Sequence, residues 1–157
     1  MTVWIGIDPG LSGAVAFLDE SGLSVVDTPV AVVKATRRDY LTGSMADCIL
    51  DTVDNRPAAA ALEQGIPMPR SASNVTYLLG RGGGLWEGIL AASTIPYELA
   101  TPRKWKKAMG IPSGSDKGAS RMLASRLFPE HAHLFARVKD DGRAEAALLA
   151  EYRRRIG

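Results

Sequence analysis

The first thirty residues contain three short apolar runs separated by turn-forming residues. Residues 3–8, 13–18 and 23–28 are each rich in apolar and β-branched side chains. Residues 19–22, with the sequence Asp-Glu-Ser-Gly, separate the last two runs and are typical of a tight turn. This pattern predicts three antiparallel strands that follow one another along the chain.

The spacing of apolar residues then changes from that of a strand to that of a helix. Apolar positions recur every three or four residues over 45–53, with Thr42 or Ser44 available as the N-cap. Residues 58–63 are short, apolar and end on an acid, which is typical of a buried parallel strand. We therefore expect a crossover helix and then a fourth strand that places Glu63 at its tip.

The remaining residues predict helices around one further strand. Residues 65–73 contain two prolines and predict a loop, and residues 95–99 predict the last strand. Residues 74–92 are rich in glycine but keep a helical rhythm of apolar positions, which favours a helix over a phosphate-facing loop. The other expected helices run from Pro102 to before Gly110, from a cap at Ser115 or Asp116 to Phe128, and from Asp140 or Asp141 to Arg155.

This order of elements predicts an α/β fold. Three antiparallel strands plus two parallel ones would form a five-stranded mixed sheet flanked by helices. A length of 157 residues fits a single domain, expected over 1–157. The hydrophobic share of 46% and the charged share of 23% are ordinary for a globular protein. Disordered and membrane proteins are therefore excluded as classes.

The sequence also bears on the cellular compartment. The first residues leave no room for a secretory signal before Asp8, and no apolar run is long enough to span a bilayer. Cys48 is the single cysteine and lies in a predicted helix, where a thiol is usually a packing residue. We expect a reducing, cytoplasmic setting and no membrane partner.

Four carboxylates fall at the ends of predicted elements. Asp8 ends the first strand and Glu63 ends the fourth. Asp141 and Glu145 lie on the first turns of the last helix, four residues apart and therefore on one face. Oxygen ligands from separate elements suit Mg²⁺ or Mn²⁺, and two such ions can promote cleavage of a phosphodiester. The set has the composition of a two-metal nuclease site.

These acids also have structural interpretations. Asp8 precedes Pro9 and Gly10, a combination typical of a turn. Glu63 has a possible ion-pair partner nearby in Arg70. Asp140 and Asp141 suit the start of a helix, and we expect that role for Asp140.

Basic residues form clusters although the net charge is only +2. Such clusters are solvated helix faces in most proteins and phosphate-binding surfaces in some. His131 and His133 are spaced as a possible metal pair, but their loop setting favours a surface role. The clusters are Arg37-Arg38, Arg103-Lys104, Lys106-Lys107, Arg121 with Arg126, and Arg153-Arg154-Arg155.

Taken together, several segments resemble the RuvC-type Holliday-junction resolvases, and more closely their bacteriophage and prophage members. Each motif is weak alone, but their order over nearly the whole chain is more specific. The matching segments are Ile5-Gly6-Ile7-Asp8-Pro9-Gly10, Leu62-Glu63-Gln64 with Met68-Pro69-Arg70 and Gly80-Arg81, Thr101-Pro102-Arg103-Lys104-Trp105-Lys106-Lys107, and Asp141-Gly142-Arg143-Ala144-Glu145-Ala146.

The resemblance implies an RNase H-like fold, a homodimer, and paired nicking of a four-way DNA junction in a bacterial cell or phage-infected host. It implies two Mg²⁺ or Mn²⁺ ions held by Asp8, Glu63, Asp141 and Glu145, with Lys117 as a further catalytic group. In the bacterial housekeeping members the last two acids are usually three residues apart, whereas Asp141 and Glu145 are four apart and Gly142 occupies the alternative position. Whether Asp140 or Asp141 is the ligand beside Glu145 stays open. The DNA contacts it implies are Arg70, Ser71, Ser73, Asn74, Arg81, Arg103, Lys104, Lys106, Lys107 and Lys117.

Two competing functions remain at this point. Sugar kinases and actin-like ATPases share the opening Gly-Ile-Asp-x-Gly pattern, but they place a nucleotide between two such lobes. A non-catalytic DNA-binding module with the same fold is the other alternative, and the presence of all four acids disfavours it. Trp105 can stack on a DNA base or anchor its short helix, and the second role is favoured.

Overall fold

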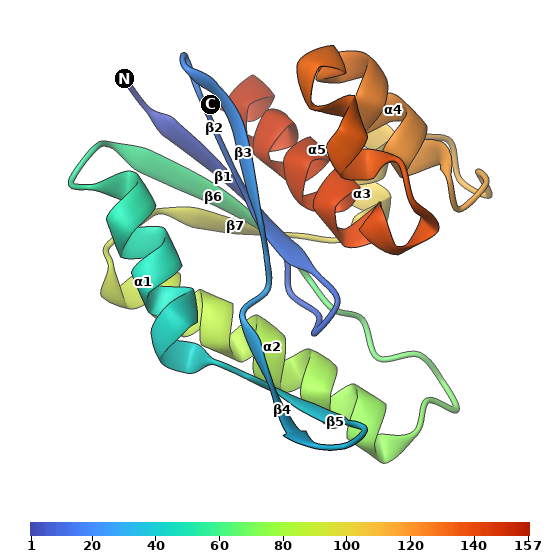
Figure 1. Cartoon of the computed structure of the whole chain (residues 1–157). Coiled ribbons are helices and arrows are strands. Elements are labelled where there is room, and N and C mark those ends of the chain that lie inside the picture. Colours follow the sequence, from blue (N-terminus) through green and yellow to red (C-terminus); the bar gives the residue numbers. More distant parts are fainter.

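The computed structural model describes residues 1–157 and contains a five-stranded mixed sheet with helices on both faces (Figure 1). The strand order is β3-β2-β1-β6-β7. β1, β2 and β3 pair antiparallel, and β6 pairs parallel with both β1 and β7. The predicted sheet is therefore confirmed. Its strands are β1 Val3–Asp8, β2 Ala14–Asp19, β3 Gly22–Asp27, β6 Ala58–Glu63 and β7 Tyr97–Ala100.

Five α-helices cover the sheet. Helices α3, α4 and α5 lie on one side of it, and α1 and α2 lie on the other (Figure 1). Two 3₁₀-helices, Pro129–Phe135 and Val138–Asp140, connect α4 to α5. None of the helices combines the length and the apolar composition that crossing a bilayer requires. The α-helices are α1 Thr42–Val53, α2 Ser73–Ala92, α3 Pro102–Ala108, α4 Ala119–Leu127 and α5 Asp141–Ile156.

Each face of the sheet has its own hydrophobic core, because successive side chains of a strand point to opposite faces. On the α1 and α2 side, Ile5 and Ile7 of β1 pack with Trp86 and other large residues. On the α5 side, the buried residues of the strands and of α5 include many alanines, such as Ala16 and Ala146. Small side chains on both surfaces allow the axis of α5 to lie close to the sheet.

Gly6 is the point of closest approach between β1 and α5. A Cβ atom at this position would overlap the carbonyl oxygen of Ala146 and the amide nitrogen of Ala150. It would also lie 2.8 Å from the carbonyl carbon of Leu149. These are backbone atoms, which cannot turn away as a side chain can. The absence of a side chain at Gly6 therefore allows the backbone of α5 to pack directly against β1.

A two-stranded hairpin between β3 and α1 was not predicted. It consists of β4 Val30–Lys34 and β5 Arg37–Tyr40. Most of its side chains are exposed or half-buried on both faces, so the sequence lacks the alternation by which a strand is recognised. Tyr40 anchors the hairpin, because its buried hydroxyl donates to the carbonyl oxygen of Leu78 at 2.9 Å.

The predicted helix over 74–92 is confirmed, but two predicted helix starts are wrong. Helix α1 begins at Thr42 itself, after Leu41, and no side chain caps it. Helix α4 begins at Ala119 because Asp116 accepts a hydrogen bond from the amide of Gly118 at 2.6 Å. That bond forms a separate turn before the helix, a common alternative for an aspartate near a helix start.

Candidate active site

Asp8 and Glu63 lie at the carboxyl ends of two neighbouring parallel strands. β1 and β6 are paired in register, with Ile7 opposite Leu62, so the two acids follow side by side. The first turn of α5 lies directly above this edge of the sheet. A Cβ atom on Gly142 would come within 2.5 Å of the carbonyl oxygen of Ser12 and 3.2 Å of Asp8 Oδ2. The glycine therefore lets α5 bring its own acids to Asp8.

Burial and mutual repulsion perturb the acids at this edge. Burial, followed by repulsion from Glu63 and Glu145, raises the pKa of Asp8 to about 7. Burial and repulsion from Glu145 likewise raise the pKa of Glu63 to about 7, although a hydrogen bond from Trp105 opposes the shift. Asp8, Glu63 and Glu145 are therefore close enough to interact strongly as like charges. Such perturbed groups in a cleft are characteristic of functional sites.

Three of the four predicted metal ligands are held by donors from α3 and α4. In this conformation no three of the acids converge on one ion position. The partner of Glu63 is not Arg70, the possible ion-pair partner suggested by the sequence. The contacts are Trp105 Nε1 to Glu63 Oε2 at 2.7 Å, Arg121 Nε to Asp141 Oδ1 at 2.7 Å, and Lys106 Nζ to Glu145 Oε1 at 2.6 Å.

The chemistry of the donor set fits a divalent cation. Carboxylate oxygens are the ligands that Mg²⁺ and Mn²⁺ prefer. Ionised Asp8 and Glu63 repel each other at a partly buried position, and a cation between them would remove that cost. Asp141 and Glu145 are bound only by side chains that can rotate away. The assignment of these four residues as metal ligands stays a prediction.

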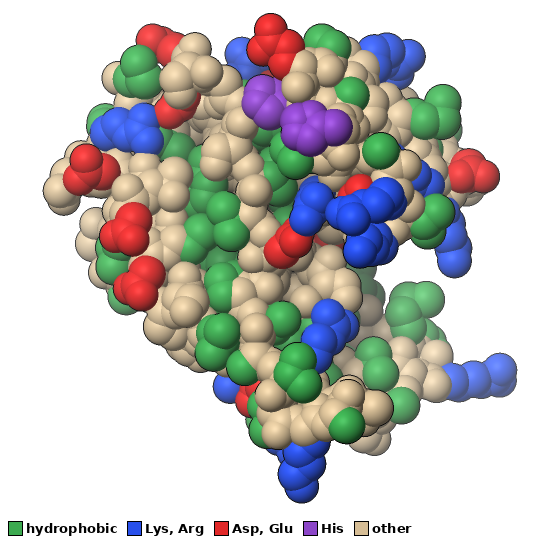
Figure 2. Space-filling model, viewed as in Figure 1, with side chains coloured by type: hydrophobic (Ala, Val, Ile, Leu, Met, Phe, Trp, Pro, Cys, Tyr) green, Lys and Arg blue, Asp and Glu red, His purple; other side chains and the backbone are tan.

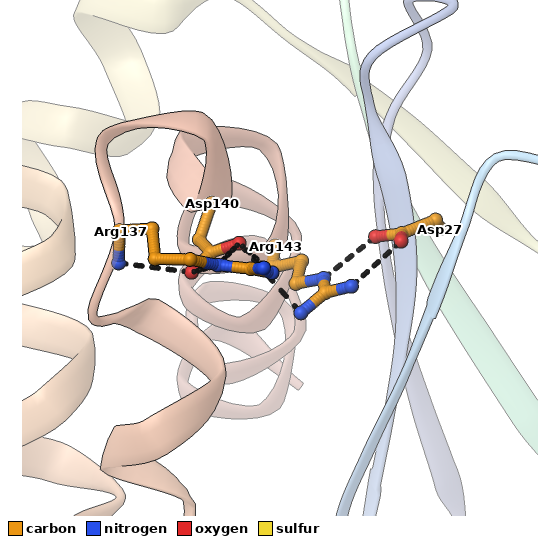
Figure 3. Close-up of polar contacts among 4 residues, drawn as sticks. All are labelled: Asp27, Arg137, Asp140 and Arg143. Atoms are coloured by element: carbon orange, nitrogen blue, oxygen red, sulfur yellow. Dashed lines mark hydrogen bonds and ion pairs between the residues drawn. The ribbon is translucent and has the colours of Figure 1, made fainter.

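Asp140 and Asp141 are neighbours in sequence but differ in environment. The Asp140 side chain is only 2% exposed and is held by Arg137 and Arg143 (Figure 3). Arg143 also donates to both carboxylate oxygens of Asp27, at the end of β3, at 2.7 Å each. Asp141 instead lines the cleft at Asp8. Asp140 therefore anchors the start of α5, and Asp141 is the acid available beside Glu145.

An open cleft of about 950 Å³ lies over three of the acids, and Glu63 lines a separate cavity beside β6 and α2. Asp8, Asp141 and Glu145 line the open cleft, together with the loop between α3 and α4. Its basic lining residues are Arg103, Lys106, Lys107 and Lys117. Figure 2 shows the molecule hollowed between the side formed by α4 and α5 and the projecting end of α2, with Lys and Arg side chains on both edges.

The other predicted DNA contacts lie away from this cleft. Lys104 pairs with Glu98 of β7. Arg81 pairs with Asp39 of the hairpin, and its guanidinium lies 5.6 Å from the centroid of the Tyr40 ring. Arg70, Ser71, Ser73 and Asn74 are exposed in the loop before α2 and at the start of that helix. Contacts by these residues with DNA stay predictions.

The sequence predicted that Trp105 anchors its helix but not that it contacts Glu63. Its ring is fully buried, which confirms that it anchors α3, and its N–H group reaches Glu63 of β6. No spacing rule connects the two residues, because the contact depends on how α3 is placed beside the end of β6. His131 and His133 lie in the 3₁₀-helix Pro129–Phe135 rather than in a loop, the first half-buried and the second exposed.

Comparisons with known proteins extend these observations. No family model matches the chain. It is 28% identical over 120 residues to "Holliday junction resolvase MOC1, chloroplastic" of Chlamydomonas reinhardtii. The match covers 75% of this chain but only 14% of that much longer protein.

Solved structures of similar fold cover nearly the whole chain. "T. thermophilus RuvC in complex with Holliday junction substrate" superposes with a TM-score of 0.62 and 17% identity, covering 99% of this chain and 96% of that one. "Thermus thermophilus RuvC structure" gives a TM-score of 0.55 and 18% identity over the same shares. The chain thus has the RNase H-like fold of the RuvC-type resolvases, as the ordered motifs predicted, whereas the closer likeness to bacteriophage and prophage members stays a prediction.

Proposed function

We propose that residues 1–157 act as one structure-selective endodeoxyribonuclease domain that resolves four-way or other branched DNA junctions by paired nicks. The observation that carries this proposal is the acidic edge formed by Asp8, Glu63 and Glu145, of which Asp8 and Glu145 line a cleft together with basic residues. The RuvC-type fold supports it, as does the name of the curated relative, a Holliday junction resolvase.

In this proposal Asp8, Glu63, Asp141 and Glu145 hold two divalent cations, Mg²⁺ or Mn²⁺. When bound, the cations activate water and neutralise charge on the scissile phosphate. The chain itself supplies four carboxylates from three elements, β1, β6 and α5. Lys106 and Arg121 hold two of these, Glu145 and Asp141, through ion pairs that a bound cation would replace. Water attacks the phosphodiester directly and leaves a 5′-phosphate, with no covalent intermediate.

The basic lining of the cleft binds the DNA backbone. Arg103, Lys107 and Lys117 line the cleft and form no ion pair with a carboxylate of the protein. Their charges are therefore available to phosphate groups. We assign Lys117 to the scissile phosphate, because its loop faces Asp141 and Glu145 across the cleft.

Paired nicks on opposite strands require two active sites, so we propose that the chain acts as a homodimer. The reducing cytoplasm of a bacterium or phage-infected host is the setting we propose, in keeping with the single thiol. Light scattering of the purified protein tests the dimer, and a monomeric mass at concentrations that support paired nicking would contradict it.

The test of the function is incubation of the purified chain with a labelled four-way junction and, separately, a linear duplex of the same sequence. With Mg²⁺ we expect symmetric nicks in the junction and no comparable cleavage of the duplex. Nicking of flaps and forks as well would broaden the substrate class. Tight junction binding without any nicking would overturn the nuclease proposal in favour of a non-catalytic DNA-binding module.

Removing two phosphate contacts should weaken junction binding in a way that depends on salt. The double variant Arg103→Ala, Lys107→Ala is expected to bind about tenfold more weakly at 0.1 M salt. The slope of log affinity against log salt should fall by about 2, because each lost phosphate contact removes about 0.9. Fluorescence anisotropy with a catalytically inactive background measures both quantities.

Lys104→Ala provides the matched control for this prediction. Lys104 lies on the same helix but is paired with Glu98 outside the cleft, so its loss should leave the salt slope nearly unchanged. Equal slopes for wild type and the double variant would remove Arg103 and Lys107 from the DNA-binding surface.

A further inference from the structure

Trp105 is a buried residue of α3 whose polar group is directed at one acid of the proposed site. Its ring is fully buried among residues of α5 and the sheet, and its Nε1–H donates to Glu63 Oε2 at 2.7 Å. Trp86, which is equally buried on the other face of the sheet, has an Nε1–H group with no hydrogen-bond partner. The fold therefore does not demand a partner for every buried indole.

The face of the same ring supports a second contact with the acids. Lys106 Nζ lies 5.2 Å from the centroid of the Trp105 ring, and the same ammonium is 2.6 Å from Glu145 Oε1. An ammonium over an indole face is held by the quadrupole of the ring. One buried side chain thus contacts Glu63 directly and Glu145 through Lys106.

We propose that Trp105 is a positioning residue that holds the Glu63 carboxylate in place for the divalent cation. This inference rests on the proposed function, in which Glu63 is a metal ligand. The indole engages Oε2 and leaves Oε1 without a donor from the protein, so one oxygen stays available. Because the indole is neutral, it fixes the carboxylate without cancelling its charge, unlike Lys106 at Glu145.

The physical benefit is a lower ordering cost when the cation binds. A glutamate side chain has several rotatable bonds, and fixing them before binding spares the entropy that binding would otherwise lose. Groups that hydrogen-bond to metal ligands in this way typically contribute 10- to 100-fold to metal affinity or activity. A contribution towards the lower end is expected here, because a single hydrogen bond is involved.

The test is the affinity of the purified protein for Mn²⁺, measured without DNA by calorimetry or by the electron paramagnetic resonance signal of free Mn²⁺. Trp105→Phe removes the N–H donor but keeps an aromatic ring beneath Lys106. We expect Mn²⁺ to bind about tenfold more weakly to this variant. Trp86→Phe is the matched control, and its Mn²⁺ affinity should equal that of wild type.

Measuring the effect of Trp105→Phe in a Glu63→Asp protein distinguishes a loss of Glu63 positioning from a general destabilisation of the fold. The shorter side chain keeps its charge but no longer reaches the indole, so adding Trp105→Phe to it should have no further effect on Mn²⁺ affinity. Raised Mg²⁺ should also restore junction nicking by the Trp105→Phe single variant. An equal loss of affinity in both backgrounds, or unchanged affinity of the single variant, would overturn the positioning role alone. Absence of any Mn²⁺ binding by wild type would overturn the two-metal function with it.

Discussion

Replacing Asp8 by Asn is expected to abolish junction nicking and, at the same time, to stabilise the metal-free protein at pH 8. Removing a group that only orients a metal ligand typically lowers metal affinity or activity 10- to 100-fold. Loss of a direct ligand should therefore lower the nicking rate at least about 100-fold. Single-turnover cleavage of a labelled four-way junction measures this loss. A variant that nicks at the wild-type rate would remove Asp8 from the active site.

The gain in stability follows from the sign of the pKa shift. The pKa of Asp8 is about 7 in the fold and near its ordinary value of 3.8 in the unfolded chain. The folded protein therefore binds the proton more tightly, and stability falls as pH rises from about 4 to about 7. Asn cannot ionise, so the stability of the variant does not fall in this pH range for this reason. The substitution also removes the repulsion from Glu63 that contributes to the raised pKa of Asp8.

We expect the Asp8→Asn variant to be more stable than wild type by about 2 kcal/mol at pH 8. This difference corresponds to a melting temperature about 6 °C higher. At pH 4.5 the two proteins should melt at nearly the same temperature. Asp47→Asn, at an exposed position of α1 with no ion-pair partner, is the control and should change stability by less than about 0.5 kcal/mol at either pH.

Thermal denaturation without metal, at both pH values, gives these numbers. Added Mn²⁺ should reverse the ranking at pH 8, because the cation binds the ionised wild-type acids and stabilises only the folded state. A variant that is less stable than wild type at pH 8 without metal would contradict the repulsion inferred for this edge of the sheet.

The second large effect is expected from Gly6→Ala. The new methyl group would collide with backbone atoms of Ala146 and Ala150, so α5 must move away from β1. Such overpacking typically lowers the free energy of unfolding by about 1–3 kcal/mol and sometimes more. Because the overlapping atoms here belong to the backbone and cannot rotate away, we expect a loss of at least about 3 kcal/mol. Urea denaturation measures this loss. Nicking should fall as well, because the displaced helix carries Asp141 and Glu145.

Gly83→Ala is the matched control for the same chemical change. A Cβ atom on Gly83, within α2, would meet nothing within 4 Å. Alanine is a better helix former than glycine, so this variant should gain about 0.5–1 kcal/mol. If Gly6→Ala changed stability by less than about 1 kcal/mol, the close approach of α5 to β1 would be contradicted.

The sheet and its acids were predictable because their signals are local. Alternating apolar residues indicated β1 to β3, and the short apolar run before Glu63 indicated a parallel strand. Parallel strands end at the same edge of a sheet, so placing Glu63 beside Asp8 required only the order of elements. The β4–β5 hairpin gave no such signal, since exposed strands carry no core-facing pattern.

The partners of the acids were not predictable because they depend on packing between distant elements. Arg70 is close to Glu63 in sequence, yet the indole of Trp105, forty-two residues away, occupies that position. The sequence favoured Asp140 as the helix-start residue but left open which of Asp140 and Asp141 is the acid beside Glu145. Arg137, one turn earlier, binds Asp140, and this contact distinguishes the two acids.

The seating of α5 on β1 has a consequence for the order in which the chain matures during synthesis. β1 (Val3–Asp8) is synthesised before α5 (Asp141–Ile156), with most of the other elements between them. The seat at Gly6 and the acidic edge cannot be completed until α5 has been made. Nascent chains that have not reached α5 therefore lack Asp141 and Glu145 and cannot complete the acidic edge.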